Sequence, residues 1–238
     1  MKKYLFLPAV SMVLLFMFCT KRSDVTVTQP VKVFPSPQKT NSYLALGDSY
    51  TIGQSVPANA SFPAQLVQAL GLQQLGFTDP NIIARTGWTT DELQSAINTE
   101  QPTNNFDLVT LLIGVNNQFR NYSKTTYRQG FVSLLNQSIT FAKGNKQHVF
   151  VLSIPDWGVT PYANGYDRST IAKEIDQFNA INKEESLKAG VVYVDITAIS
   201  RTAANDPSLI AEDGLHPSAK MYGLWVKELA PAILLNFK

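Results

Sequence analysis

The sequence predicts a three-layer α/β/α fold, in which a doubly wound, five-stranded parallel sheet is covered by helices on both faces. Short apolar runs alternate along the chain with longer amphipathic segments, which is typical of β-α-β units. The strongest run, 107–113, is unbroken, as expected for a parallel strand that is buried on both sides. At 238 residues and 45% hydrophobic composition, the chain suits one sizeable domain with a short additional segment.

Each predicted element has its own local signal. Ser61, with Pro63 in the first turn, starts the first long helix, and Thr89-Thr90-Asp91-Glu92 forms a capping box for the second. Right-handed crossovers between parallel strands favour the flavodoxin-like strand order. The predicted strands are 43–46, 81–84, 107–113, 149–154 and 191–196, and the predicted helices are 61–70, 89–97, 124–142, 169–189 and 217–235.

Residues 1–19 have the layout of a secretory signal: Lys2-Lys3 precedes the apolar run 4–18, and Cys19 follows at once. The run is short for a bilayer span, which needs roughly 20 residues. Cys19 is the sole cysteine and resembles the lipid-modified cysteine of bacterial lipoproteins, with Phe18 in place of that motif's small residue. The sequence therefore predicts an exported, lipid-anchored protein of the cell envelope. An uncleaved anchor and an incidental cysteine are the alternatives.

Residues 20–41 are rich in Thr, Ser, Pro and Gln, which is typical of an extended linker, although 31–34 could also form an edge strand. The predicted catalytic domain is 42–238. Lys and Arg number 20 against 18 Asp and Glu, and removal of residues 1–18 takes away Lys2 and Lys3, which leaves 18 against 18. A neutral domain of this kind is a poor nucleic-acid binder.

Candidate catalytic residues follow the predicted strands at the carboxyl edge of the sheet. Ser49 comes directly after the first strand, in Gly47-Asp48-Ser49, and a serine needs a base, for which histidine suits neutral pH. His148 starts the fourth strand, at the wrong edge, and we expect it to be structural. His216 follows the fifth strand, and Asp213 precedes it by three residues, a spacing that can orient the imidazole toward a serine.

Two further loops offer donors for an oxyanion hole. Gly87 follows the second strand and has no side chain to block its N–H, while Asn116 follows the third strand with a side-chain amide. Each also has a simpler interpretation, since Gly87 could shape a turn and Asn116 could cap one.

Together these stretches resemble the SGNH hydrolase superfamily, also called the GDSL esterase/lipase family. The matches are Gly47-Asp48-Ser49, Gly87, Gly114-Val115-Asn116 and Asp213-Gly214-Leu215-His216, in that order. The resemblance implies a flavodoxin-like fold and a catalytic triad of Ser49, His216 and Asp213. It also implies an oxyanion hole made of the Ser49 N–H, the Gly87 N–H and the Asn116 amide. Tyr50 replaces the leucine of the family name, and Asn117 stands where many members have aspartate.

The expected reaction is hydrolysis of carboxylic esters through an acyl-enzyme, with no metal or cofactor. Trp88 and Trp157 follow the second and fourth strands and could stack on a sugar ring, line an acyl pocket or cover the core. Short acyl esters, O-acetylated glycans among them, are the expected substrates of a shallow site. A lysophospholipase or thioesterase is the alternative within the class, and a surface glycan-binding lipoprotein is the alternative outside it.

Overall fold

Five parallel strands form one sheet in the computed structural model, which describes residues 40–103 and 105–237. The strands are β1 (Tyr43–Asp48), β2 (Asn81–Arg85), β3 (Leu108–Leu112), β4 (Val149–Leu152) and β5 (Val192–Val194). Their order, β2-β1-β3-β4-β5, is the predicted flavodoxin-like order. The central strands β1, β3 and β4 are buried along their whole length, which explains their unbroken apolar runs.

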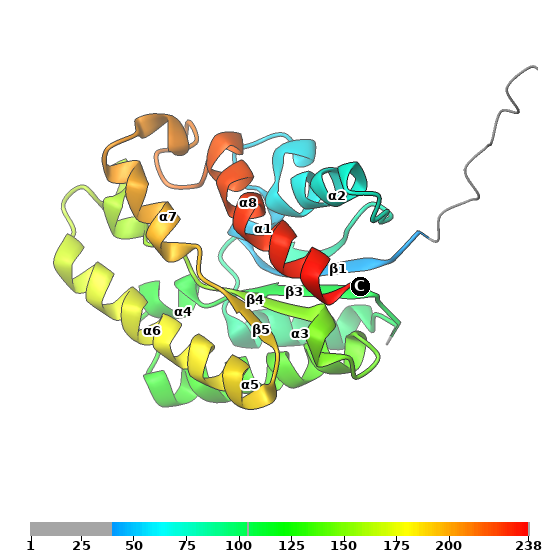
Figure 1. Ribbon diagram of the computed structural model, residues 1–238. Coiled ribbons are helices and arrows are strands. Elements are labelled where there is room, and N and C mark those ends of the chain that lie inside the picture. Colours follow the sequence, from blue (N-terminus) through cyan, green and yellow to red (C-terminus); the bar gives the residue numbers. More distant parts are fainter. Residues whose placement is uncertain (1–39, 104, 238) are drawn as a thin grey trace, which may run out of the picture. The chain divides into compact units, whose positions relative to one another are not determined.

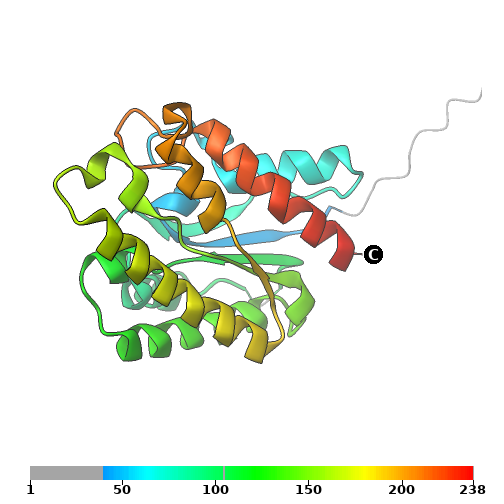
Figure 2. The ribbon, with the colours of Figure 1, turned by 60° about the vertical axis from the view of Figure 1, so that its left-hand side comes forward.

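The helices form two layers, one on each face of the sheet (Figure 1). On one face α2 (Phe62–Leu72) packs against α8 (Ala219–Asn236). The opposite layer contains α3 (Thr90–Glu100), α5 (Lys124–Phe141) and α6 (Arg168–Ala189), in which α5 contacts both neighbours. The turned view keeps the sheet between the same two groups (Figure 2). The three-layer α/β/α prediction is therefore confirmed.

The predicted capping box is present at the start of α3. The Thr89 N–H donates to Glu92 Oε2 over 2.9 Å, and the Thr89 side chain accepts from the backbone three residues on. The cap of α2 differs from the prediction, because Ser61 Oγ donates to the Ala58 carbonyl instead of accepting from the helix.

The structure differs from the prediction at the start of the last helix and in three short helices after strands. Pro217 was expected to open the last helix, but it pairs with Ile210 in an antiparallel bridge, so Ser218 becomes the N-cap of α8. The short helices α1 (Ser49–Ile52), α4 (Val115–Phe119) and α7 (Thr197–Arg201) lie where loops were expected. A helix of four or five residues carries too little periodicity to be recognised in a sequence.

The predicted signal segment 1–19 with Cys19, and the linker as far as residue 39, lie outside the described residues. Asn41, predicted as the last linker residue, already contacts the domain: its N–H donates to the Gly76 carbonyl, and its carbonyl accepts from Thr78, both over 2.9 Å. In the part of the chain that the structure describes, no helix has the length and apolar character needed to cross a membrane.

Candidate active site

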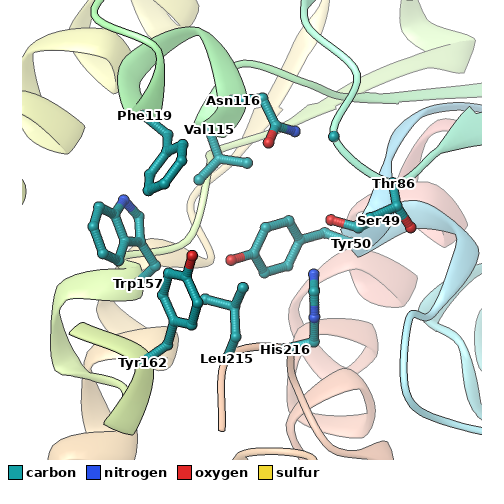
Figure 3. Close-up of a pocket in the computed structure, with 11 residues that line it drawn as sticks. Ser49, Tyr50, Thr86, Val115, Asn116, Phe119, Trp157, Tyr162, Leu215 and His216 are labelled. Carbon is teal, nitrogen blue, oxygen red and sulfur yellow. The ribbon is translucent and has the colours of Figure 1, made fainter. Parts of the chain in front are cut away.

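Two of the predicted catalytic residues, Ser49 and His216, line one cleft at the carboxyl edge of the sheet (Figure 3). Ser49 begins α1 directly after β1, Asn116 lies in α4 after β3, and His216 lies in the loop between α7 and α8. Figure 3 shows the ring edge of His216 pointing toward the Ser49 hydroxyl. The residues that line the cleft are Ser49, Tyr50, Thr86, Gly87, Val115, Asn116, Phe119, Trp157, Tyr162, Leu215 and His216.

The turn that presents Ser49 requires a glycine before it. A Cβ on Gly47 would lie 2.1 Å from Thr51 Oγ1 and 2.4 Å from the Leu112 carbonyl oxygen, so no larger residue fits between β1 and β3. Asp48 is the N-cap of α1, and its Oδ1 accepts from the Tyr50 N–H over 3.0 Å. Asp48 therefore fixes the turn that presents Ser49 through this contact.

Asp48 is fully buried, and burial raises the pKa of its carboxyl from 3.8 to about 7, although the hydrogen bond from the Tyr50 backbone opposes the shift. Its second oxygen, Oδ2, lies 3.5 Å from the Asn116 amide nitrogen. The residue beside the nucleophile is therefore a carboxyl group that takes up a proton close to neutral pH.

His216 and Asp213 form the predicted pair. His216 Nδ1 lies 2.5 Å from Asp213 Oδ2, and the His216 side chain is buried. The other carboxylate oxygen, Oδ1, accepts from the N–H groups of Leu215 and His216 over 3.0 and 2.9 Å. The three-residue spacing therefore lets one carboxylate hold both the backbone and the ring of the histidine.

Ser55 contacts the Asp213–His216 pair in a way that the sequence did not reveal. Its hydroxyl donates to Asp213 Oδ2 over 2.6 Å, across 158 positions of sequence, and its backbone is left-handed at φ 67°. Partial desolvation opposes ionisation of Asp213, but the hydrogen bonds from Ser55 and His216 outweigh it and hold the pKa of this carboxyl well below its usual range. Asp213 is therefore an anion at neutral pH.

Gly87, a predicted oxyanion-hole donor, lines the cleft and has φ 86°. A Cβ at this position would meet Arg120 Nη2 at 3.5 Å and nothing nearer, so the left-handed backbone rather than crowding explains the glycine. The Gly87 carbonyl accepts from Arg120 Nη2 over 2.6 Å, and Arg120 also pairs with Glu92 of the capping box. These contacts fix the loop through the Gly87 carbonyl, and the Gly87 N–H takes no part in the hydrogen bond with Arg120.

Asn116, the other predicted side-chain donor, also lines the cleft, but its amide nitrogen is engaged: Nδ2 donates to the Trp88 carbonyl over 3.0 Å. An amide nitrogen carries two N–H groups, and this bond uses one of them. The second N–H is directed to Asp48 Oδ2 at 3.5 Å, so it could donate to an oxyanion only by leaving that contact.

Asn117 holds the same loop against the start of α3. It is fully buried, its Oδ1 accepts from the Thr90 N–H over 3.1 Å, and its Nδ2 donates to Thr90 Oγ1 over 2.9 Å. An asparagine at the position where many family members have aspartate thus ties α4 to the first turn of α3 through two hydrogen bonds.

The two tryptophans predicted near the substrate have different positions. Trp157 lines the cleft but is 4% exposed, and its N–H donates to Gln118 Oε1 over 2.8 Å. Trp88 is not among the cleft residues, so the structure does not bring it together with Ser49 and His216. The Trp88 N–H donates to the Arg85 carbonyl and so closes the turn that leads into α3. The Trp88 side chain lines a surface hollow beside that helix.

Other aromatic residues of the cleft were missed. Phe119 and Tyr162 line it from α4 and from the loop after β4, and Tyr50 stacks at a tilt beside His216, with ring centroids 5.3 Å apart.

His148 lies just before β4, at the end of that strand opposite the cleft, where its ring stacks on Phe237 with ring centroids 3.9 Å apart. The prediction that His148 is structural agrees with that contact.

The fold and the cleft define an α/β protein in which a serine, a histidine and an aspartate meet at the carboxyl edge of a flavodoxin-like sheet. The sequence profile of the GDSL-like Lipase/Acylhydrolase family matches residues 45–224, and the chain belongs to this family of SGNH-type ester hydrolases. No curated protein sequence matches the chain significantly.

Solved structures share the fold. The chain is 16% identical to TesA with a TM-score of 0.62, over 82% of this chain and 99% of that one. It is 18% identical to a lipase/acylhydrolase from Enterococcus faecalis, with a TM-score of 0.63 over 82% and 95% of the two chains. It is 20% identical to Axe2, an acetylxylan esterase from Geobacillus stearothermophilus, with a TM-score of 0.59 over 82% and 93%. At these identities the likeness concerns the fold.

Proposed function

We propose that this protein hydrolyses short-chain carboxylic esters, with Ser49 as nucleophile, His216 as general base and then acid, and Asp213 as the group that orients the imidazole. The observation that carries the proposal is the 2.5 Å contact between His216 Nδ1 and Asp213 Oδ2 beside Ser49 in a shared cleft. With Nδ1 committed to the carboxylate, the other ring nitrogen is the one available to a serine.

The reaction then proceeds in two halves. Ser49 Oγ attacks the ester carbonyl while His216 takes its proton, and the alcohol leaves with that proton. Water attacks the acyl-enzyme in the same way and releases the acid. The oxyanion of each tetrahedral intermediate is held by the Ser49 and Gly87 N–H groups and the second N–H of Asn116. Removal of one such donor typically costs about 3 to 4 kcal/mol of transition-state stabilisation.

The cleft supports small, uncharged substrates, with O-acetylated glycans as the narrower proposal. It encloses about 520 Å³, including open solvent at its mouth, and none of its lining residues is Asp, Glu, Lys or Arg. A lysophospholipid brings a charged headgroup, and a long acyl chain needs an enclosed apolar channel, so these observations favour the acetyl ester over the lipid alternative. The fold does not choose between these substrates, because an acetylxylan esterase and a lipase/acylhydrolase both share it.

Hydrolysis of 4-nitrophenyl acetate, butyrate and octanoate tests the proposal, with Ser49→Ala and His216→Ala as variants. We expect turnover to fall from acetate to octanoate, and kcat to fall by about 10³-fold or more in each variant. Wild-type protein that is folded but no faster than either variant on any ester would refute the catalytic proposal and favour the glycan-binding alternative. A preference for octanoate would favour the lipid hydrolase.

We also propose export and attachment to the cell envelope through a lipid on Cys19, which rests on Lys2-Lys3, the apolar run 4–18 and the position of the sole cysteine. Detergent phase partition of the protein expressed in a bacterial host tests this, with Cys19→Ser as the matched variant. Recovery of the wild type in the detergent phase and of the variant in the aqueous phase is the expected result.

A further inference from the structure

Exposed aromatic side chains gather at one end of the cleft. Six large hydrophobic side chains are exposed among residues 40–103 and 105–237, and the three aromatic ones are Phe119, Tyr162 and Tyr166, with exposed fractions of 42, 45 and 49%. The other three are leucines, namely Leu72, Leu187 and Leu235. Phe119 and Tyr162 line the cleft itself, whereas Tyr166 extends the surface beyond it. We call Phe119, Tyr162 and Tyr166 the aromatic wall.

The aromatic wall is held by a buried support. Phe119, Tyr162 and Tyr166 each pack edge-on against Trp157, with ring centroids 5.4, 6.1 and 5.2 Å from it. Tyr162 and Tyr166 are nearly parallel, with planes 19° apart. Because Trp157 is buried and hydrogen-bonded to Gln118, the three exposed rings have a fixed backing rather than a flexible one.

The wall faces the catalytic group across the cleft. Figure 3 shows Phe119, Trp157 and Tyr162 on the side opposite Ser49, with Tyr50 between them. The hydroxyl groups of Tyr50 and Tyr162 both point into the space that separates the wall from Ser49. An ester whose carbonyl reaches Ser49 therefore has room to extend its remaining part over these hydroxyls and onto the exposed rings.

The chemistry of this surface fits a sugar ring. A pyranose has a face of C–H groups, which packs on an aromatic ring, and a rim of hydroxyls, which tyrosine hydroxyls can bond. An acyl chain would instead be expected to lie among aliphatic side chains in a closed channel, whereas the wall is aromatic and 42 to 49% exposed. The absence of Asp, Glu, Lys and Arg from the cleft lining suits a neutral sugar.

We propose that the aromatic wall binds the pyranose ring that carries the ester, on the alcohol side of an acetylated glycan. This inference rests on the proposed esterase function and adds the residues that select the alcohol. Phe119 and Tyr162 would contact the ring that bears the reacting acetyl group, and Tyr166 would contact the next ring of a chain.

The test compares two acetyl esters that differ in the alcohol: methyl glucopyranoside acetylated at a single hydroxyl and ethyl acetate, both followed by release of acetate. We expect the ratio of kcat/KM for the glycoside to kcat/KM for ethyl acetate to fall about tenfold in Phe119→Ala and in Tyr162→Ala, mainly through KM. Tyr162→Phe keeps the ring and should lower the ratio about two- to threefold. Leu72→Ala, which removes an exposed side chain on α2, is the matched control and should leave the ratio unchanged.

An unchanged ratio in both alanine variants would overturn the inference. So would a loss confined to the preference between octanoate and acetate esters, because the wall would then bind an acyl chain. Saturation-transfer NMR of acetylated methyl glucopyranoside on Ser49→Ala separates this inference from the proposed function. Transfer to the sugar that disappears when Tyr162→Ala is added supports the wall even if the wild type hydrolyses nothing, and absence of transfer counts against it.

Discussion

The two sides of the candidate catalytic site are held in place by different forces. Ser49 belongs to a buried turn: β1, Asp48, Tyr50 and Thr51 are all buried, and the turn is packed between neighbouring strands. Asp213 lies at the surface, with a side chain that is 30% exposed. Its loop is closed by hydrogen bonds such as Ala211 N–H to the His216 carbonyl, at 2.7 Å, and by the hydroxyl of Ser55.

The packed core and the hydrogen-bonded loop therefore have different roles at this site. Ser49, the proposed nucleophile, is positioned by close packing, where displacement of a side chain costs van der Waals contacts in every direction. Asp213 and the ring of His216 are positioned by a few polar contacts, each of which can be removed alone. Substitutions on the Asp213 side should therefore change catalysis with little effect on stability, whereas substitutions on the Ser49 side should change both.

Asp213→Asn should give the largest effect. The amide oxygen can still accept from the Leu215 and His216 N–H groups, but an amide nitrogen in place of Oδ2 would donate to His216 Nδ1. The imidazole would then carry its proton on the nitrogen that faces Ser49 and could not accept another. We expect kcat on 4-nitrophenyl acetate to fall by about 10²- to 10⁴-fold, with KM little changed.

Asp206→Asn is the matched control, because Asp206 is also a loop carboxylate but pairs with Lys220 at 2.7 Å, outside the residues that line the cleft. Its activity should equal that of the wild type. Thermal unfolding of both variants should lie within a few degrees of the wild type. Full activity in Asp213→Asn would show that the carboxylate does not set the tautomer.

The sequence predicted the packed side of the site better than the polar side. Apolar runs located all five strands, and Gly47-Asp48-Ser49 at the end of β1 placed the nucleophile, because burial leaves a continuous pattern in the residues themselves. The spacing of Asp213 and His216 was equally readable, since their contact is local. Ser55 was not, because a serine in a polar loop has no pattern that points to a partner 158 residues away.

The aromatic residues show the same limit. Trp88 and Trp157 were chosen because they follow strands, but the direction of a side chain after a strand depends on the turn that follows. Gly87, at φ 86°, is part of the turn that leads Trp88 toward α3, whereas Phe119 reaches the cleft from a five-residue helix that was not predicted. Which aromatic residues are exposed is a property of the packed loops, and only the three-dimensional structure shows it.

Asp48→Asn tests the packed side of the site through the pH dependence of its stability. Because the unfolded carboxyl has a pKa near 3.8 and the folded one near 7, the unfolded state binds fewer protons between these values. The contribution of Asp48 to stability therefore falls as the pH rises from about 4 to about 7. The variant lacks this titration, so the free energy of unfolding of the variant minus that of the wild type should rise by roughly 3 to 4 kcal/mol over the same interval.

Urea unfolding of both proteins at unit steps from pH 4 to pH 8 measures that difference. The altered contact with Asn116 adds a constant offset, so the slope, not the absolute value, tests the raised pKa. A difference that stays flat between pH 4 and pH 7 would show that Asp48 titrates normally in the folded protein. The lowered pKa of Asp107, which pairs with Lys143 at 2.8 Å at the far end of β3, is common to both proteins, so its effect on stability cancels in the difference.

Ser55 gives the smallest expected effect and the clearest separation of catalysis from stability. Ser55→Ala and Ser55→Gly both remove the hydroxyl that donates to Asp213, so both should lower kcat on 4-nitrophenyl acetate by about three- to tenfold. Only the glycine relieves the left-handed backbone at φ 67°, and it should be more stable than the alanine variant by roughly 1 kcal/mol. Ser55→Thr, which keeps a hydroxyl, should recover part of the activity. If the two variants instead differ in kcat as they differ in stability, Ser55 acts through the shape of its loop, and its hydrogen bond does not position the carboxylate that orients His216.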